Sequence, residues 1–183
     1  MRQFDLARRL VEELQGLGVS DAEVDDKCYV YGSLPATKGY EAATRLGLIA
    51  HMDTAPDFCG ANVKPRLIPQ YDGSDLPLGT SGRTLTAKQF PHLKTLVGRT
   101  LLVTDGTTLL GADDKAGIAE IMTVLERIQA ESIPHGKLSV CFTPDEEVGS
   151  GADHFDVARF GADFAYTCDG DAENEIEYEN FNA

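Results

Sequence analysis

The chain has 183 residues, of which 42% are apolar and 25% charged, so it is long enough to bury a hydrophobic core within about one domain. This composition excludes a disordered or fibrous protein. A formal net charge of -14 argues against nucleic acid or anionic membranes as partners and favours cations. Part of the acidic excess is expected where divalent metals neutralise it, because crowded carboxylates otherwise raise one another's pKa.

The four cysteines are widely spaced and contain no Cys-x-x-Cys pair, which favours a reducing compartment over a disulfide scaffold. The first residues form an amphipathic pattern without the apolar core of a signal peptide. No later apolar run reaches the length of a membrane span. The sequence therefore predicts a cytoplasmic protein with no membrane partner.

The first predicted element is a helix over residues 4–17, in which apolar residues recur at helical spacing and Gly16 and Gly18 mark the end. Strands are predicted over residues 28–34 and 46–50, and the second one runs into His51-Met52-Asp53. Residues 55–98 form a long connection rich in Gly and Pro. A connection of this length is expected to be functional or to form a small hairpin excursion of its own.

The second half of the chain continues the alternation of strands and helices. We expect a strand over residues 100–104, a helix over residues 114–130, and strands over residues 137–142 and 164–167. The predicted fold class is α/β, with three layers, a mostly parallel or mixed sheet, and helices on both faces.

Polar clusters stand at the ends of the apolar strands and at the start of the second long helix. Ligands of open α/β sheets bind at the carboxyl ends of strands, so we expect the clusters to converge although they are distant in sequence. A single such acid is more often a cap or a solvated turn residue. The clusters are His51-x-Asp53, Asp113-Asp114, Glu146-Glu147 and Asp169.

His51 and Asp53 are two residues apart, so continued strand geometry would place both side chains on the same side of the chain. The carboxylate can then hold the imidazole by one nitrogen, as is usual for histidines that bind metals. A histidine that is merely part of the core is the competing interpretation, and the presence of an acidic partner weakens it. His51 is therefore a candidate metal ligand.

Asp113 and Asp114 follow a glycine-containing turn at the start of a predicted helix, where free N–H groups and the helix dipole favour an ionised carboxylate. An ionised carboxylate with two oxygens can bridge two zinc ions. One of the two aspartates can cap the helix while the other binds metal.

Glu146 and Glu147 are adjacent, and two carboxylates need different environments to perform different tasks at neutral pH. One can bind metal while the other accepts a proton from metal-activated water. Asp169 would complete a three-residue set with His51 and Asp113 around one ion.

Four ordered segments of the chain resemble the signatures of the M20 di-zinc metallopeptidases. They are His51-Met52-Asp53-Thr54-Ala55-Pro56-Asp57, Leu109-Leu110-Gly111-Ala112-Asp113-Asp114-Lys115-Ala116-Gly117, Phe142-Thr143-Pro144-Asp145-Glu146-Glu147-Val148-Gly149 and Tyr166-Thr167-Cys168-Asp169-Gly170. The resemblance extends over nearly the whole chain, and four motifs in the same order make chance similarity improbable.

The resemblance implies two Zn²⁺ ions, one bound by His51, Asp113 and Asp169, and the other by Asp113 and Glu147. It also implies that Glu146 is the general base and that Asp53 orients His51. The implied reaction releases the N-terminal residue of tripeptides with metal-activated water, so the expected partner is a short peptide.

The resemblance also implies that residues 1–183 form a single, partial catalytic domain. Family members continue through a lid or dimerisation domain and return to the catalytic domain, where a histidine completes the second zinc site. The alternatives are a non-catalytic metal-binding or interaction module, or a dipeptidase or carboxypeptidase specificity of the same family. A magnesium phosphohydrolase is disfavoured because His51 and the two glutamates suit zinc better than magnesium.

Overall fold

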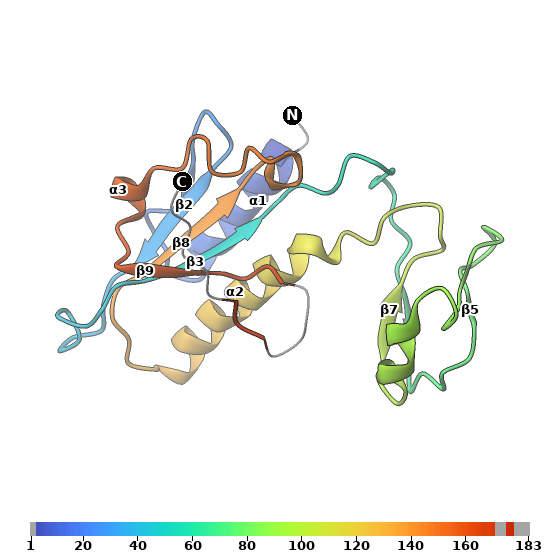
Figure 1. Cartoon of the computed structure of the whole chain (residues 1–183). Helices are drawn as coiled ribbons and strands as arrows, with labels where there is room; N and C mark the ends of the chain where they lie inside the picture. The colour runs from blue at the N-terminus through green and yellow to red at the C-terminus, as the bar shows by residue number, and fades with distance from the viewer. Residues whose placement is uncertain (1–2, 171–174, 178–183) are drawn as a thin grey trace. The chain divides into compact units, whose positions relative to one another are not determined.

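The chain forms two compact units in a computed structural model that describes residues 3–170 and 175–177 (Figure 1). The first unit consists of residues 1–53 and 113–183, and the second consists of residues 54–112. The first unit contains a five-stranded sheet and the second contains two two-stranded sheets, and each unit buries apolar residues of its own. No helix among the described residues is long and apolar enough to cross a membrane.

The first unit is built on a five-stranded sheet in the order β1-β2-β8-β3-β9. The central strand β8 pairs in parallel with β3 and antiparallel with β2, while β9 pairs in parallel with β3, which confirms the predicted mixed sheet. The strands are β1 (Glu23–Val24), β2 (Val30–Leu34), β3 (Leu46–His51), β8 (Leu138–Thr143) and β9 (Phe164–Thr167).

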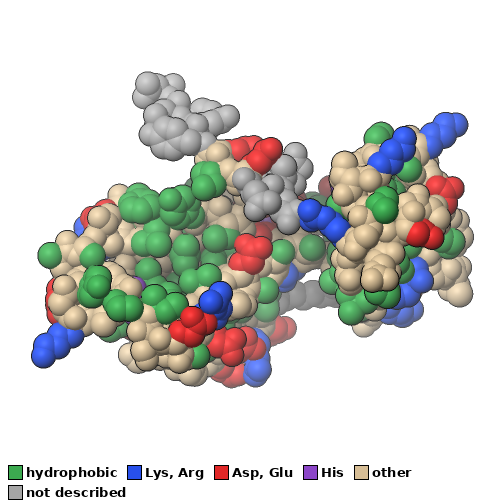
Figure 2. Space-filling view, turned by 90° about the horizontal axis from the view of Figure 1, so that it is seen from below, with side chains coloured by type: hydrophobic (Ala, Val, Ile, Leu, Met, Phe, Trp, Pro, Cys, Tyr) green, Lys and Arg blue, Asp and Glu red, His purple; other side chains and the backbone are tan. Residues whose placement is uncertain are grey.

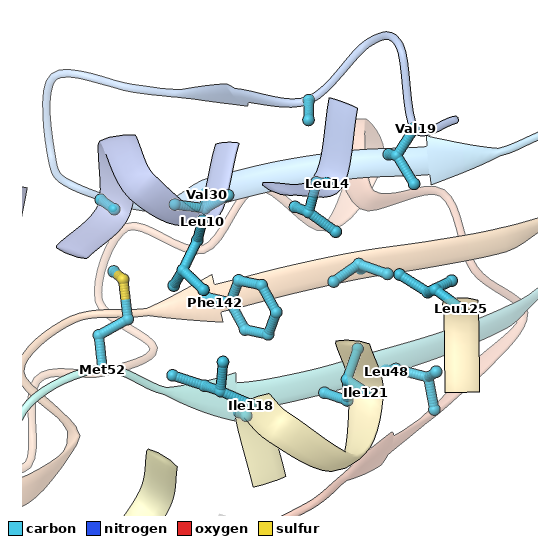
Figure 3. Packing of buried hydrophobic residues seen from close by; sticks show 14 of the residues in the cluster. Leu10, Leu14, Val19, Val30, Leu48, Met52, Ile118, Ile121, Leu125 and Phe142 are labelled. Carbon is cyan, nitrogen blue, oxygen red and sulfur yellow. The ribbon is translucent and has the colours of Figure 1, made fainter. Parts of the chain in front are cut away.

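The main core lies on one face of this sheet, beneath the two long helices α1 (Gln3–Gly16) and α2 (Ala112–Glu131). Side chains alternate along a strand, so every second residue of β8 faces this core. Leu10 and Leu14 of α1 and Ile121 and Leu125 of α2 point toward Phe142 and its neighbours on the sheet (Figure 3). Both helices have the periodic apolar stripe that predicted them.

The opposite face of the sheet carries a smaller cluster of mostly aromatic residues. Tyr29, Tyr31, Cys141 and Phe160 are buried there, and Phe155 packs against them with its ring 5.1 Å from that of Phe160. Phe160 ends the short helix α3 (Val157–Phe160), whose N-cap Asp156 accepts a hydrogen bond from the Arg159 N–H. Helices therefore lie on both faces, as predicted, but the two long ones share a single face.

The second unit contains two antiparallel strand pairs, one of which lies within residues 55–98, where a hairpin excursion was one of the two expectations. β4 (Arg66–Ile68) pairs with β7 (Leu101–Val103), and β5 (Leu76–Pro77) pairs with β6 (Thr84–Leu85). A 3-10 helix, η1 (Pro91–Leu96), contributes Leu93 to a small core.

Basic side chains are frequent on the surface of the second unit (Figure 2). Residues 54–112 contain six Lys and Arg residues and four Asp and Glu residues, so the acidic excess of the chain lies entirely in the first unit. That unit also contains every residue predicted to bind metal or act in catalysis, as expected if some of these charges attract cations.

Candidate metal centre

The predicted polar clusters converge at one edge of the first unit's sheet. β3 and β8 are parallel and in register from Leu46 to His51, so the residues that follow them emerge side by side. β9 runs parallel to β3 on its other side and delivers Asp169 to the same edge. The first turn of α2 supplies Asp113. The sequence prediction of convergence is therefore confirmed.

The imidazole of His51 occupies the middle of this group and is only 2% exposed. Its Nε2 lies 2.8 Å from Asp113 Oδ1 and 3.7 Å from Asp169 Oδ2, while its Nδ1 lies 3.2 Å from Asp53 Oδ1. Burial lowers the pKa of His51, but the hydrogen bond with Asp113 and the charges of nearby aspartates outweigh burial, and the net pKa is raised. The imidazole ring is therefore surrounded by carboxylates.

Asp53 does more than orient the histidine, because its two oxygens also bind the backbone that follows β8. Oδ1 accepts a hydrogen bond of 3.1 Å from the Glu146 N–H, and Oδ2 accepts one of 3.0 Å from the Glu147 N–H. Its side chain is 9% exposed, so these charge-assisted bonds are shielded from water. Asp53 therefore fixes the turn that carries both glutamates relative to His51.

The aspartate pair divides its two tasks between its members. Asp113 is exposed, with its carboxylate toward His51, whereas Asp114 is buried and caps α2 by accepting a 3.0 Å hydrogen bond from the Gly117 N–H. The peptide bond between them is cis, and neither residue has helical backbone angles. The structure thus settles which aspartate caps and which faces the histidine, a choice that the residue pattern left open.

The two glutamates stand in a 3-10 turn, η2 (Glu146–Val148), and have different relations to the group. Glu146 is half-exposed, and its Oε2 reaches to 3.9 Å from His51 Nε2. Glu147 is tied to the site through its backbone N–H, as described above, and its carboxylate is not part of the His51, Asp113 and Asp169 group. The role of Glu147 as a metal ligand stays a prediction.

Lys115 is a site residue that the sequence reasoning missed. Its half-buried ammonium donates hydrogen bonds to the backbone oxygens of Met52, at 3.3 Å, and Asp53, at 2.8 Å. Burial lowers the pKa of Lys115, and the surrounding carboxylates oppose that shift. The only signal available in the sequence was its place directly after Asp113-Asp114, three residues before Ile118 of the predicted apolar stripe.

The donor set fits a divalent transition metal. One donor atom each from His51, Asp113 and Asp169 lie within 4.8 Å of one another, and these three residues form the one such group found among the described residues. Imidazole with carboxylates suits zinc and similar metals. The second nitrogen of His51 is bonded to a carboxylate, which is the usual arrangement behind a histidine that binds metal. These three residues could hold a metal ion.

Residues 105–177 match the model of peptidase family M20/M25/M40.

The chain is also similar to peptidase T. It is 55% identical to the peptidase T of Alkaliphilus oremlandii over 184 aligned residues, which cover 99% of this chain and 45% of that protein. The solved structure of an aminopeptidase PepT from Bacillus cereus has a TM-score of 0.67 at 28% identity, covering 90% of this chain and 37% of that one. A Staphylococcus aureus tripeptidase gives 0.66 at 28% identity, with coverages of 91% and 38%. The chain spans less than half the length of these relatives.

Proposed function

We propose that this chain is the metal-binding part of an aminopeptidase that releases the N-terminal residue of tripeptides. The observation that carries the proposal is the geometry of His51, whose ring is held by Asp53 on one nitrogen and faces two carboxylates with the other. The names of the relatives supply the reaction, since they include peptidase T, an aminopeptidase and a tripeptidase.

The proposed cofactor is two Zn²⁺ ions. His51, Asp113 and Asp169 would bind one ion, and Asp113 with Glu147 would bind the second. The hydrogen bond from the Glu147 N–H to Asp53 Oδ2 supports this assignment, because it keeps Glu147 beside His51, Asp113 and Asp169. The M20 resemblance further implies a lid domain and a returning segment with a histidine for the second zinc, which a chain of the relatives' length would contain.

Bound zinc would polarise the scissile carbonyl and lower the pKa of a water molecule. Glu146 would accept the proton of that water at Oε2 and pass it to the leaving amine, since its half-exposed carboxylate lies 3.9 Å from His51 Nε2. Asp53 would keep Glu146 within reach of the reacting atoms through the backbone N–H that it binds. Asp113 would carry negative charge between the two cations.

The test combines zinc content with hydrolysis of Leu-Gly-Gly, followed by chromatography of the products. The 183-residue chain is compared with a chain of the relatives' full length. We expect the short chain to bind zinc with weak or absent turnover, and the long chain to release Leu and Gly-Gly. Glu146→Gln should keep zinc but lose hydrolysis in the long chain, whereas Asp169→Ala should lose zinc affinity.

Other outcomes would replace the proposal with a different function. Release of the C-terminal glycine would indicate a carboxypeptidase, and cleavage of dipeptides alone would indicate a dipeptidase. Zinc binding without hydrolysis in both chains would indicate a metal-binding module. Rapid hydrolysis by the 183-residue chain alone would contradict the prediction that this segment is an incomplete catalytic domain. Location in a reducing cytoplasm stays a prediction, supported by the four cysteines, which are all free.

A further inference from the structure

We propose that Asp114 and Gly117 are positioning residues that set the spacing of the metal ligands without binding metal themselves. The proposal rests on the metal site of the proposed function and concerns what holds its three ligands together. These ligands come from β3, α2 and the end of β9, which are far apart in the sequence. Asp114 and Gly117 lie where these three elements meet.

Asp114 joins β3 to the first turn of α2. Its Oδ2 accepts a 3.0 Å hydrogen bond from the His51 N–H, and its Oδ1 accepts a 3.0 Å bond from the Gly117 N–H. The side chain is 3% exposed, so each oxygen depends on its protein donor because water cannot replace it. Since Asp113 directly precedes this carboxylate, the two bonds fix the distance between the His51 backbone and that of Asp113.

Gly117 sets how closely the end of β9 approaches the same turn. A Cβ atom added to Gly117 would lie 1.9 Å from the Cys168 carbonyl oxygen and 2.5 Å from Asp114 Oδ1. The Cys168 N–H donates a 2.7 Å hydrogen bond to the Ile49 oxygen, so the peptide segment at Cys168, just before Asp169, is held between β3 and α2. Any side chain at residue 117 must push this peptide outward, and Asp169 with it.

A positioning role and a purely structural role of Gly117 predict different effects on metal affinity. If Gly117 acts on metal binding through Asp169, its substitution should matter only while Asp169 is present. If Gly117 merely stabilises the fold, its substitution should weaken binding by the same factor whether or not Asp169 is there. A double-mutant cycle separates the two cases.

The experiment measures zinc affinity of the 183-residue chain by competition with a chromophoric chelator, in the wild type, Gly117→Ala, Asp169→Ala and the double variant. Substitution of residues that support metal ligands typically costs about 10–100-fold in affinity, and we expect a loss of that size for Gly117→Ala. Relative to Asp169→Ala, the double variant should lose less affinity than Gly117→Ala loses relative to the wild type. Gly16→Ala at the end of α1 is the matched control, because no atom lies within 4 Å of its added Cβ.

Asp114→Asn is the second arm, and it decides the question if circular dichroism shows that Gly117→Ala does not fold. Asparagine keeps the size of the side chain but turns an amide donor toward one of the two N–H groups. We expect a loss of about 10–100-fold in zinc affinity. We also expect an altered visible absorption spectrum of bound Co²⁺, because the ligand geometry changes.

Two results would overturn the inference: an equal loss for Gly117→Ala with and without Asp169, or wild-type affinity and an unchanged Co²⁺ spectrum for Asp114→Asn. If Asp169→Ala itself leaves zinc affinity unchanged, the proposed metal site is wrong, which is a different failure.

Discussion

Asp53 connects two strand ends that carry different parts of the chemistry. Its carboxylate contacts His51 Nδ1 and accepts the N–H groups of Glu146 and Glu147, while Lys115 holds its backbone oxygen. A neutral side chain of the same size cannot accept both N–H groups and also bond the ring. Asp53 therefore supports both the proposed metal ligand and the proposed base.

Asp53→Asn is expected to lower zinc affinity about 10–100-fold, because the histidine loses the carboxylate that makes its ring a stronger ligand. Zinc competition measures the affinity, and circular dichroism checks the fold. Asp26→Asn is the matched control, since the Asp26 side chain is 84% exposed. Equal affinities for Asp53→Asn and the wild type would show that the carboxylate does not support the metal ligand.

The cysteine thiols are expected to differ in reactivity because their burial differs. Burial, followed by nearby acidic charges, raises the pKa of Cys28 to about 11, and burial raises that of Cys141 further, whereas Cys59 is exposed. Each unit of raised pKa lowers the reactive thiolate about tenfold at a fixed lower pH. In iodoacetamide labelling at pH 8 followed by mass spectrometry, Cys59 should react first and Cys141 only after unfolding. Early labelling of Cys141 would contradict the buried position of β8.

At this scale the sequence predicted most of the residues that the structure brings together around His51, but not all of their contacts. His51, Asp113 and Asp169 could be predicted because each follows an apolar strand or opens a helix. The buried, capping role of Asp114 could not, because an Asp-Asp pair does not show which side chain turns inward. The second task of Asp53 depends on the adjacency of β3 and β8, which no local pattern reports.

Long helices and strands were predictable from the sequence, and short ones were not. α1, α2 and the strands β2, β3, β8 and β9 follow from apolar stripes or buried runs. α3 has four residues and β1 has two, which is too few for any periodicity. The sequence therefore did not predict α3, the short helix on the second face of the sheet, although helices on both faces were expected.

Gly47 on β3 is the residue at which the second face of the sheet contacts Phe160 of α3. A Cβ at this residue would lie 2.4 Å from an edge atom of the Phe160 ring and 2.9 Å from the Ala165 Cβ. The φ angle of Gly47 is not positive, so any residue could adopt this backbone conformation. Glycine is required here only because there is no room for a side chain. The ring of Phe160 is buried and cannot move away without disturbing α3.

Gly47→Ala is expected to lower the free energy of unfolding by about 1–3 kcal/mol through overpacking, measured by urea denaturation. Phe160→Ala removes the ring and should cost about 3–5 kcal/mol by itself. The double variant should be less destabilised than the sum of the two, because the alanine methyl then fills part of the vacated space. Strict additivity would show that Gly47 and Phe160 do not act on each other.

On the scale of the whole molecule, the division into two units was only partly visible in the sequence. The Gly- and Pro-rich composition indicated an excursion within residues 55–98, but its strands are two or three residues long and carry no clear alternation. Its core is formed by Tyr71, Leu76 and Leu93, which are distant enough in sequence to form no local pattern. The prediction of a single partial catalytic domain concerns the longer relatives and stays a prediction.

All three residues of the proposed metal-binding group belong to the first unit, so destabilising the second unit should leave metal binding unchanged. Leu93 is 5% exposed in the small core, so Leu93→Ala is expected to lower the local stability of that unit by about 2–5 kcal/mol. Hydrogen exchange should then accelerate across residues 66–103, where β4 pairs with β7, while zinc affinity stays at the wild-type value. Leu125→Ala, in the core beneath α2, is the matched control in the first unit and should leave exchange in residues 66–103 unchanged. A parallel fall in zinc affinity for Leu93→Ala would show that the two units are energetically coupled at the metal site.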